Sequence, residues 1–306
     1  MRLGRVVALL LPLTLVVSAC TSDATPSTGP TPDPDAIRVV ATTTVLADLV
    51  RQVGGTRVTV LSLVPKGGEV HTFDPNPEAL TAVSGAQLIV MNGLGLDDWV
   101  GELAAQVANL EPRIVRLGEN LAGVTYLGAA EGEAGVNPHL WLDITYARRY
   151  VERISEALVT LDAAHAAQIR ASAAAYESRL AQLDAWTREQ IATIPAANRK
   201  LVSFHDAFPY FARAYGLEIV GVAVEAPGQD PSAGQIAALI DAIRATGVRA
   251  VFTEAQFSPD LARTIADETK TKIVSNLYND SVGDPPAETY EGLIRWDVAQ
   301  IVEALR

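Results

Sequence analysis

Residues 163–194 have the sequence AAHAAQIRASAAAYESRLAQLDAWTREQIATI. It is rich in Ala, Gln, Arg, Glu and Leu, it contains no Gly or Pro, and Pro195 follows it directly. Such residues favour a helix, and a proline ends a helix that precedes it. The sequence therefore predicts one uninterrupted helix, about 48 Å long at 1.5 Å per residue.

Short runs rich in Val and Ile lie on both sides of this helix and alternate with segments of helical character, such as Pro77–Ser84 and Ala233–Thr246. Brief apolar runs separated by helices are typical of buried parallel strands. We therefore predict an α/β fold in which one long α-helix bridges two parallel-sheet lobes. The expected strands are Ile37–Ala41, Val58–Val64, Gln87–Met91 and Arg113–Arg116 before the helix, and Lys200–Phe204, Glu218–Val224, Ala250–Thr253 and Lys272–Ser275 after it.

The expected organisation has a first lobe over residues 37–162, the connecting helix over 163–195 and a second lobe over 196–306. Residues 20–36 are predicted to be a flexible linker. Four prolines, four threonines, two serines and a glycine lie between residues 21 and 36. Such a segment buries too little apolar surface to offset the entropy that ordering costs.

The first nineteen residues have the pattern of a secretory signal. Arg2 and Arg5 precede an apolar run over residues 6–17, which is too short to span a membrane. The small residues Ser18 and Ala19 before Cys20 resemble a bacterial lipobox, in which the signal is cut before the cysteine and the thiol is lipidated. An ordinary signal with a chance cysteine is the alternative. The lipobox predicts a protein tethered to the membrane through Cys20.

Charge and cysteine content exclude several classes of function. The 306 residues contain 36 Asp and Glu but only 24 Lys and Arg, which gives a net charge of −12. Loss of residues 1–19 removes two arginines and no acidic residue, so the remaining chain carries −14. A nucleic-acid binder needs a basic surface, so we expect no nucleic-acid partner. A single cysteine excludes a disulfide framework and a cysteine-rich metal site.

Ionisable residues follow several predicted strands. His71 lies in a Pro/Gly loop after the second strand, His205 directly follows the strand Lys200–Phe204, and Asp280 comes shortly after the last strand. Ligands of open α/β sheets bind at such strand ends. His139, in Asn-Pro-His-Leu-Trp, cannot be assigned to a strand end. Three imidazoles and a carboxylate could bind zinc, although for any one of these histidines alone the structural role is the favoured interpretation.

His165 illustrates the structural alternative. It falls in the alanine-rich helical run, and we expect its side chain to be solvated.

Four segments resemble a family of metal-binding lipoproteins, the adhesin-like substrate-binding proteins of zinc and manganese ABC importers. They are VPKGGEVHTFDP (64–75), MNGLGLDDW (91–99), NPHLWLD (137–143) and SFHDAFPYF (203–211), and Asn279-Asp280-Ser281 matches the family's late acidic ligand. These segments occur in the family's order, and the resemblance covers essentially Ile37 to Arg306. The resemblance implies a protein that binds a metal and delivers it to a permease, and not an enzyme.

The resemblance assigns His71 and His139 of the first lobe and His205 and Asp280 of the second lobe as ligands of one divalent metal ion in the cleft between the lobes. Manganese-binding members often have Glu at the third position, so His205 favours Zn2+, with Mn2+ possible. Many zinc-binding members also carry a histidine-rich loop, whereas residues 128–136 contain no histidine. Further acidic residues in or near the matched segments could orient ligands or organise loops: Asp74, Asp97, Asp98, Asp143, Asp206 and Glu254.

The implied partners are an ABC transporter permease with its cytoplasmic ATPase and, through the lipid anchor, the outer face of the bacterial cytoplasmic membrane. The alternatives are a zinc-dependent hydrolase, with Asp280 or Glu69 as base, and an adhesin built on the same scaffold. A hydrolase would leave one metal position open for water, and the chain contains no His-Glu-x-x-His motif.

Overall fold

The computed structural model describes residues 33–306 apart from 109–112, 129–134 and 226. The expected signal and Cys20 lie outside this range. The described part of the expected linker begins with Asp33, whose backbone N–H donates to the carbonyl of Thr56 at 3.0 Å. Its carboxylate also pairs with Arg57 at 2.9 Å. The folded part of the chain therefore includes Asp33, ahead of the first strand.

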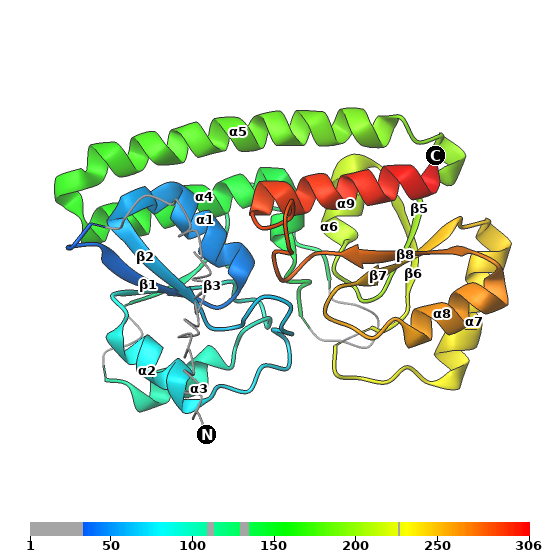
Figure 1. The fold of residues 1–306 in the computed structure, drawn as a ribbon, viewed down its shortest axis with the longest axis horizontal. Coiled ribbons are helices and arrows are strands. Elements are labelled where there is room, and N and C mark those ends of the chain that lie inside the picture. Colours follow the sequence, from blue (N-terminus) through cyan, green and yellow to red (C-terminus); the bar gives the residue numbers. More distant parts are fainter. Residues whose placement is uncertain (1–32, 109–112, 129–134, 226) are drawn as a thin grey trace, which may run out of the picture. The chain divides into compact units, whose positions relative to one another are not determined.

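Two four-stranded parallel sheets share one strand order (Figure 1). The first has the order β2-β1-β3-β4 and the second β6-β5-β7-β8. All eight expected strands are present, and their ends differ from the prediction by at most two residues. They are β1 (Ile37–Ala41), β2 (Val58–Ser62), β3 (Leu88–Met91), β4 (Ile114–Arg116), β5 (Lys200–Ser203), β6 (Glu218–Val222), β7 (Ala250–Glu254) and β8 (Lys272–Leu277).

Helices cover both faces of each sheet. Helices α2 and α3 pack on one face of the first sheet, and α7 and α8 pack on the corresponding face of the second. The opposite faces meet α1 and α4 in the first lobe and α6 and α9 in the second. The helices are α1 (Thr44–Gly54), α2 (Pro77–Gly85), α3 (Val100–Gln106), α4 (Ile144–Leu161), α5 (Ala166–Ala192), α6 (Pro209–Tyr215), α7 (Ala233–Thr246), α8 (Asp260–Thr269) and α9 (Tyr290–Leu305).

The long helix α5 bridges the two lobes, as predicted, and packs against α1 and α4 at one end and α6 and α9 at the other (Figure 1). Its buried residues recur every three to four positions, which places them on one side of the helix. Because this stripe belongs to a core shared by both lobes, α5 fixes the lobes to one another. The buried residues are Ile169, Ala173, Tyr176, Leu180, Leu183, Thr187 and Ile191.

The helix begins three residues later than predicted. Residues 163–165 form a separate 3-10 turn ahead of the helix. In this turn Nδ1 of His165 lies 2.8 Å from the carboxylate of Asp162. At the other end the helix stops at Ala192, shortly before Pro195. In the described part of the chain, none of the helices is both long and apolar enough to span a bilayer.

Tyr290, the first residue of α9, joins the end of the chain to the first lobe. Its hydroxyl donates to the carbonyl of Trp141 at 2.6 Å, and its backbone N–H donates to Asp48 at 2.8 Å. Trp141 in turn donates its indole N–H to the carbonyl of Asn279, after β8, at 2.9 Å. All these groups are buried. The two lobes are therefore joined by hydrogen bonds as well as by the shared core.

This arrangement predicts different effects for two buried tyrosines. Tyr290→Phe leaves the carbonyl of Trp141 without its donor and should lower the free energy of unfolding by about 1–3 kcal/mol. Tyr176→Phe removes a buried hydroxyl that has no hydrogen-bond partner among the described residues, and should leave the free energy of unfolding unchanged or raised. Urea unfolding of the two variants measures the difference. Equal losses in both variants would contradict the account of these contacts.

Candidate metal centre

His71 lies in the loop that follows β2. Its backbone N–H donates to Oε1 of Glu69 at 2.8 Å. Trp99 fixes the same loop by donating its indole N–H to the carbonyl of Val70 at 3.0 Å. The His71 side chain is 19% exposed, whereas those of the other three expected ligands are at most 2% exposed. The site is therefore most accessible to solvent on the side of His71.

His139 is oriented by Asn137, two residues before it. Both the backbone N–H and Nδ1 of His139 lie 3.1 Å from Oδ1 of Asn137. The Asn137 amide nitrogen donates to the backbone carbonyl and the carboxylate of Asp206, which identifies Oδ1 as the acceptor. Nδ1 of His139 must therefore carry the proton, and Nε2 presents its lone pair to the site.

His205 follows β5 and is bound by Glu254 at the end of β7. One oxygen of the Glu254 carboxylate accepts the backbone N–H of His205 at 3.1 Å. The other oxygen pairs with Nδ1 of the His205 ring. This contact directs Nε2 away from Glu254 and toward His139, whose Nε2 lies 3.2 Å away. A carboxylate behind an imidazole also makes the imidazole a stronger donor to a cation.

Asp280 lies in the loop after β8. Its backbone N–H donates to the side-chain oxygen of Asn279 at 2.6 Å. Before it, the backbone N–H of Tyr278 donates to Asp297 at 3.0 Å. These contacts hold the loop so that the Asp280 carboxylate faces the three imidazoles.

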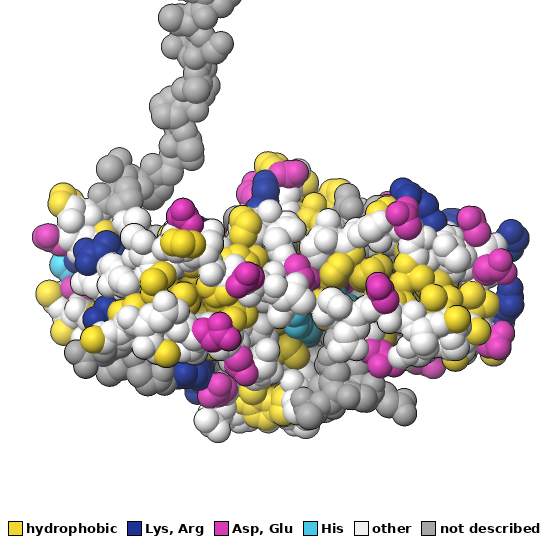
Figure 2. Space-filling model, turned by 90° about the horizontal axis from the view of Figure 1, so that it is seen from below, with side chains coloured by type: hydrophobic (Ala, Val, Ile, Leu, Met, Phe, Trp, Pro, Cys, Tyr) yellow, Lys and Arg dark blue, Asp and Glu magenta, His cyan; other side chains and the backbone are white. Residues whose placement is uncertain are grey.

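The four expected ligands meet at one place, although their positions span more than two hundred residues. One donor atom from each of His71, His139, His205 and Asp280 lies within 4.8 Å of all the others. Oδ1 of Asp280 is 3.5 Å from Nε2 of His139, and Oδ2 is 3.7 and 3.8 Å from Nε2 of His71 and His205. Figure 2 shows histidine near the middle of one face, with acidic side chains around it.

Burial and neighbouring charges shift the pKa values of these groups in opposite directions. Burial, with a smaller effect from His205, lowers the pKa of His71 to about 3 and also lowers that of His139 well below its usual value. Burial would lower the pKa of His205 too, but the carboxylate of Glu254 outweighs it and raises the pKa to about 9. Burial raises the pKa of Asp280 to about 8. Without a cation the site therefore retains protons on His205 and Asp280.

The donor set fits a divalent transition metal. Zinc bound tetrahedrally at about 2.0–2.1 Å needs donor atoms about 3.3–3.4 Å apart, close to the shorter separations found here. Nε2 of His71 and Oδ1 of Asp280 are buried and have no hydrogen-bond partner within the described ranges. A cation would satisfy both of these atoms. Three imidazole nitrogens with a carboxylate suit zinc better than calcium or magnesium.

The other acidic residues singled out in the sequence have different places. Glu254 contacts His205, and Asp206 contacts Asn137, so both act on ligand-bearing segments. Asp97 is buried and accepts hydrogen bonds from Thr42 and from the backbone of residues 92 and 93, which organises the loop after β3. Asp143 caps α4, while Asp74 and Asp98 are exposed.

Two residues that support the site were not expected from the sequence. Asn137 lies two residues before His139 and directs its ring, and Gln256, two residues after Glu254, lies 3.5 Å from the carboxylate of Asp280. The residues that they contact lie in distant loops, so no local sequence pattern identifies either of them. The only available clue is that each lies within or beside a segment at the end of a strand. His165 is outside the cluster, at the turn between α4 and α5, and its side chain is 43% exposed.

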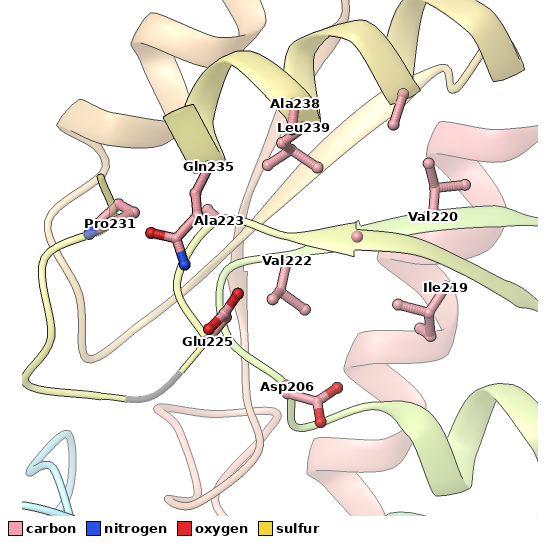
Figure 3. Close-up of a pocket in the computed structure, with 12 residues that line it drawn as sticks. Asp206, Ile219, Val220, Val222, Ala223, Glu225, Pro231, Gln235, Ala238 and Leu239 are labelled. Atoms are coloured by element: carbon pink, nitrogen blue, oxygen red, sulfur yellow. The ribbon is translucent and has the colours of Figure 1, made fainter. Parts of the chain in front are cut away.

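A separate groove of about 690 Å³ lies along the edge strand β6, beneath α7 (Figure 3). Aliphatic side chains of both elements line most of it, including Val220, Val222 and Leu239. Asp206, Glu225 and Gln235 supply its polar groups. The four clustered donors do not line this groove, so it is distinct from the metal centre.

Comparison with known proteins gives matches over nearly the whole chain. The manganese-binding lipoprotein of Halalkalibacterium halodurans is 30% identical over 295 residues, which cover 96% of this chain and 95% of the relative. The manganese ABC transporter substrate-binding lipoprotein of Streptococcus pneumoniae is 25% identical over 310 residues, or 99% of each chain. The structure of a periplasmic zinc binding protein from Treponema pallidum has a TM-score of 0.81 at 27% identity, over 88% of this chain and 99% of that one.

These relatives are named as metal-binding or substrate-binding proteins, which supports a binding protein over the hydrolase alternative. The profile of the family described as zinc-uptake complex component A, periplasmic, matches residues 39–304. The chain therefore belongs to this family, and it is a metal-binding substrate-binding protein of an ABC transporter.

Proposed function

We propose that the protein captures one divalent transition-metal ion at His71, His139, His205 and Asp280 and delivers it to the permease of an ABC importer. Zinc is the favoured cargo and manganese the next. The observation that carries this proposal is the convergence of three imidazole nitrogens and one carboxylate, from loops of both lobes, in a buried space. Because all four donors come from protein, the site suits capture of an ion and leaves no position dedicated to a reacting water.

Zinc is favoured because of the third donor. His205 supplies nitrogen where an oxygen donor would shift the set toward harder ions such as manganese. The contact of Glu254 with Nδ1 leaves Nε2 of His205 as the atom that faces the cluster, so the third donor is a nitrogen. The relatives compared above include both manganese- and zinc-binding proteins, so family membership alone does not select the metal.

We also propose that delivery takes place at the outer face of the cytoplasmic membrane. The lipobox-like junction at Cys20 and the lipoprotein relatives support an exported, lipid-anchored protein. The permease and its ATPase are the expected partners, by analogy with relatives that belong to ABC transporters.

The first test is metal binding by the parent chain and two histidine variants. Purified metal-free protein should bind one ion, and a metal at a thousand times its dissociation constant should stabilise the fold by about 4 kcal/mol. His205→Glu should lose zinc affinity more than manganese affinity, since a nitrogen donor becomes an oxygen donor. Competition titration calorimetry measures both affinities.

His165→Ala is the matched control, because that histidine is partly exposed and lies outside the cluster. It should bind zinc and manganese as the parent does. A parent protein that binds no ion would contradict the proposed function. Loss of binding in His165→Ala, together with unchanged binding in His205→Glu, would show that the ligand assignment is wrong.

The shifted pKa values predict that metal binding releases protons. In the metal-free protein the pKa of His205 is about 9 and that of Asp280 about 8, so both hold protons at pH 7 and must lose them to a metal. Affinity should therefore rise with pH up to about pH 9 and fall in acid, by about tenfold per pH unit for each proton displaced. Calorimetry in buffers of different ionisation enthalpy counts the protons. Affinity that is constant between pH 6 and pH 9 would disprove this assignment.

Cys20 provides a separate prediction about the anchor. Cys20→Ala should release the mature protein from membranes, because the lipidated thiol is lost, while the metal affinity stays unchanged. Fractionation of cells that express the two forms measures the membrane-bound share. If Cys20→Ala stays with the membranes as the parent does, the lipobox interpretation is wrong.

A further inference from the structure

The loop that follows Asp280 is bound to the first lobe. The backbone N–H of Val282 donates to Oγ1 of Thr44, the first residue of α1, at 3.0 Å. The hydroxyl of Ser281, directly after Asp280, lies 3.1 Å from the same Thr44 oxygen. Asp280 follows β8 of the second lobe, but the next two residues of the chain are held by the first lobe. The loop therefore crosses between the lobes immediately after a proposed metal ligand.

Ser281 also contacts the loop that carries His71. The backbone N–H of Gly67, four residues before His71, donates to the Ser281 hydroxyl oxygen at 2.9 Å. Nearby, Lys66 pairs with Asp284, but these side chains are 52% and 80% exposed, and an exposed ion pair contributes little to stability. Ser281 itself is buried. Its hydroxyl is therefore the stronger of the two links between these loops.

The hydroxyl of Ser281 has every hydrogen-bonding position filled. A serine hydroxyl can donate one hydrogen bond and accept two. It donates to the backbone carbonyl of Val282 at 3.0 Å and accepts the backbone N–H of Gly67. Because its one hydrogen is used in this way, the threonine hydroxyl must be the donor in the contact with Thr44. Alanine at position 281 would leave the Gly67 N–H and the Thr44 hydroxyl without this acceptor.

Burial of the four proposed ligands restricts the release of a bound ion. The side chains of His139, His205 and Asp280 are at most 2% exposed, and that of His71 is 19% exposed. The donors must therefore move apart before solvent can reach an ion that lies between them. Movement of the His71 loop away from Asp280 would stretch the contacts of Ser281, because Ser281 is bound to both loops.

We propose that Ser281 is a positioning residue that joins the loops of His71 and Asp280 and thereby slows the release of the metal. The junction of Ser281, Thr44 and Gly67 contains none of the four donors, so it can hold the loops both before an ion binds and while it is bound. Loops that are already in place cost less to order on binding. The effect should be the same for zinc and manganese. This inference rests on the proposed function, since it concerns how long the same site retains its ion.

The test removes the two hydroxyls of the junction singly and together. Ser281→Ala should raise the rate of zinc release about tenfold, which corresponds to about 1.4 kcal/mol, within the range for a buried polar group that loses its partner. Thr44→Val keeps the shape of the side chain and should also speed release. The double variant should fall short of the product of the two single effects, because both changes break one shared contact. Stopped-flow mixing of the metal-loaded protein with excess EDTA measures the release rate, and manganese should give a similar factor.

Ser155→Ala is the control, because Ser155 is another buried serine, on α4, and has no part in the junction. It should release zinc at the rate of the parent. Unchanged release in Ser281→Ala and Thr44→Val would overturn the inference. Equal acceleration in Ser155→Ala, or single effects that multiply fully in the double variant, would overturn it too, because either result indicates a general loss of stability.

Two further results are assigned in advance. If Ser281→Ala does not fold, Thr44→Val decides the matter by its release rate against that of Ser155→Ala. Absence of zinc binding in the parent would instead overturn the proposed function on which the inference rests.

Discussion

Three imidazole nitrogens and a carboxylate face each other in a space with little access to water. Lone pairs held this close repel one another, and burial removes the water that would otherwise stabilise a charged group. A proton or a metal ion resolves the conflict. The contacts of Asn137, Glu254 and Asn279 turn three of the four donors, His139, His205 and Asp280, toward the shared space.

The fold meets this constraint by repeating one sheet topology and fixing the two copies together. His71 follows β2, His205 follows β5 and Asp280 follows β8. These donors therefore lie at the carboxyl ends of the parallel strands of their sheets. The helix α5 and the hydrogen bonds around Trp141 and Tyr290 then set the position of one lobe against the other. A stiff helix in the shared core leaves less freedom between lobes than a pair of flexible strands would.

Much of this architecture could be predicted from the sequence, because strands and helices have local patterns. The Val/Ile runs marked all eight strands, and the alanine-rich segment marked α5, although its first turn depends on the contact between His165 and Asp162. His71, His205 and Asp280 could be singled out because they follow predicted strands, but their assignment with His139 to one metal ion came from the family resemblance, since loops far apart in sequence meet only in the folded chain. The contacts of Asn137 and Gln256 could not be predicted, because amide orientation is decided by neighbours that the sequence does not reveal.

The proposed metal centre holds one cation with three histidines and one aspartate. X-ray absorption at the zinc edge tests it most directly, on protein loaded with one equivalent of zinc and freed of excess metal. We expect a shell of four light atoms at about 2.0–2.1 Å, with the outer-atom scattering that three imidazole rings produce. A six-coordinate shell of oxygen without imidazole scattering, or zinc lost during removal of the excess, would contradict it.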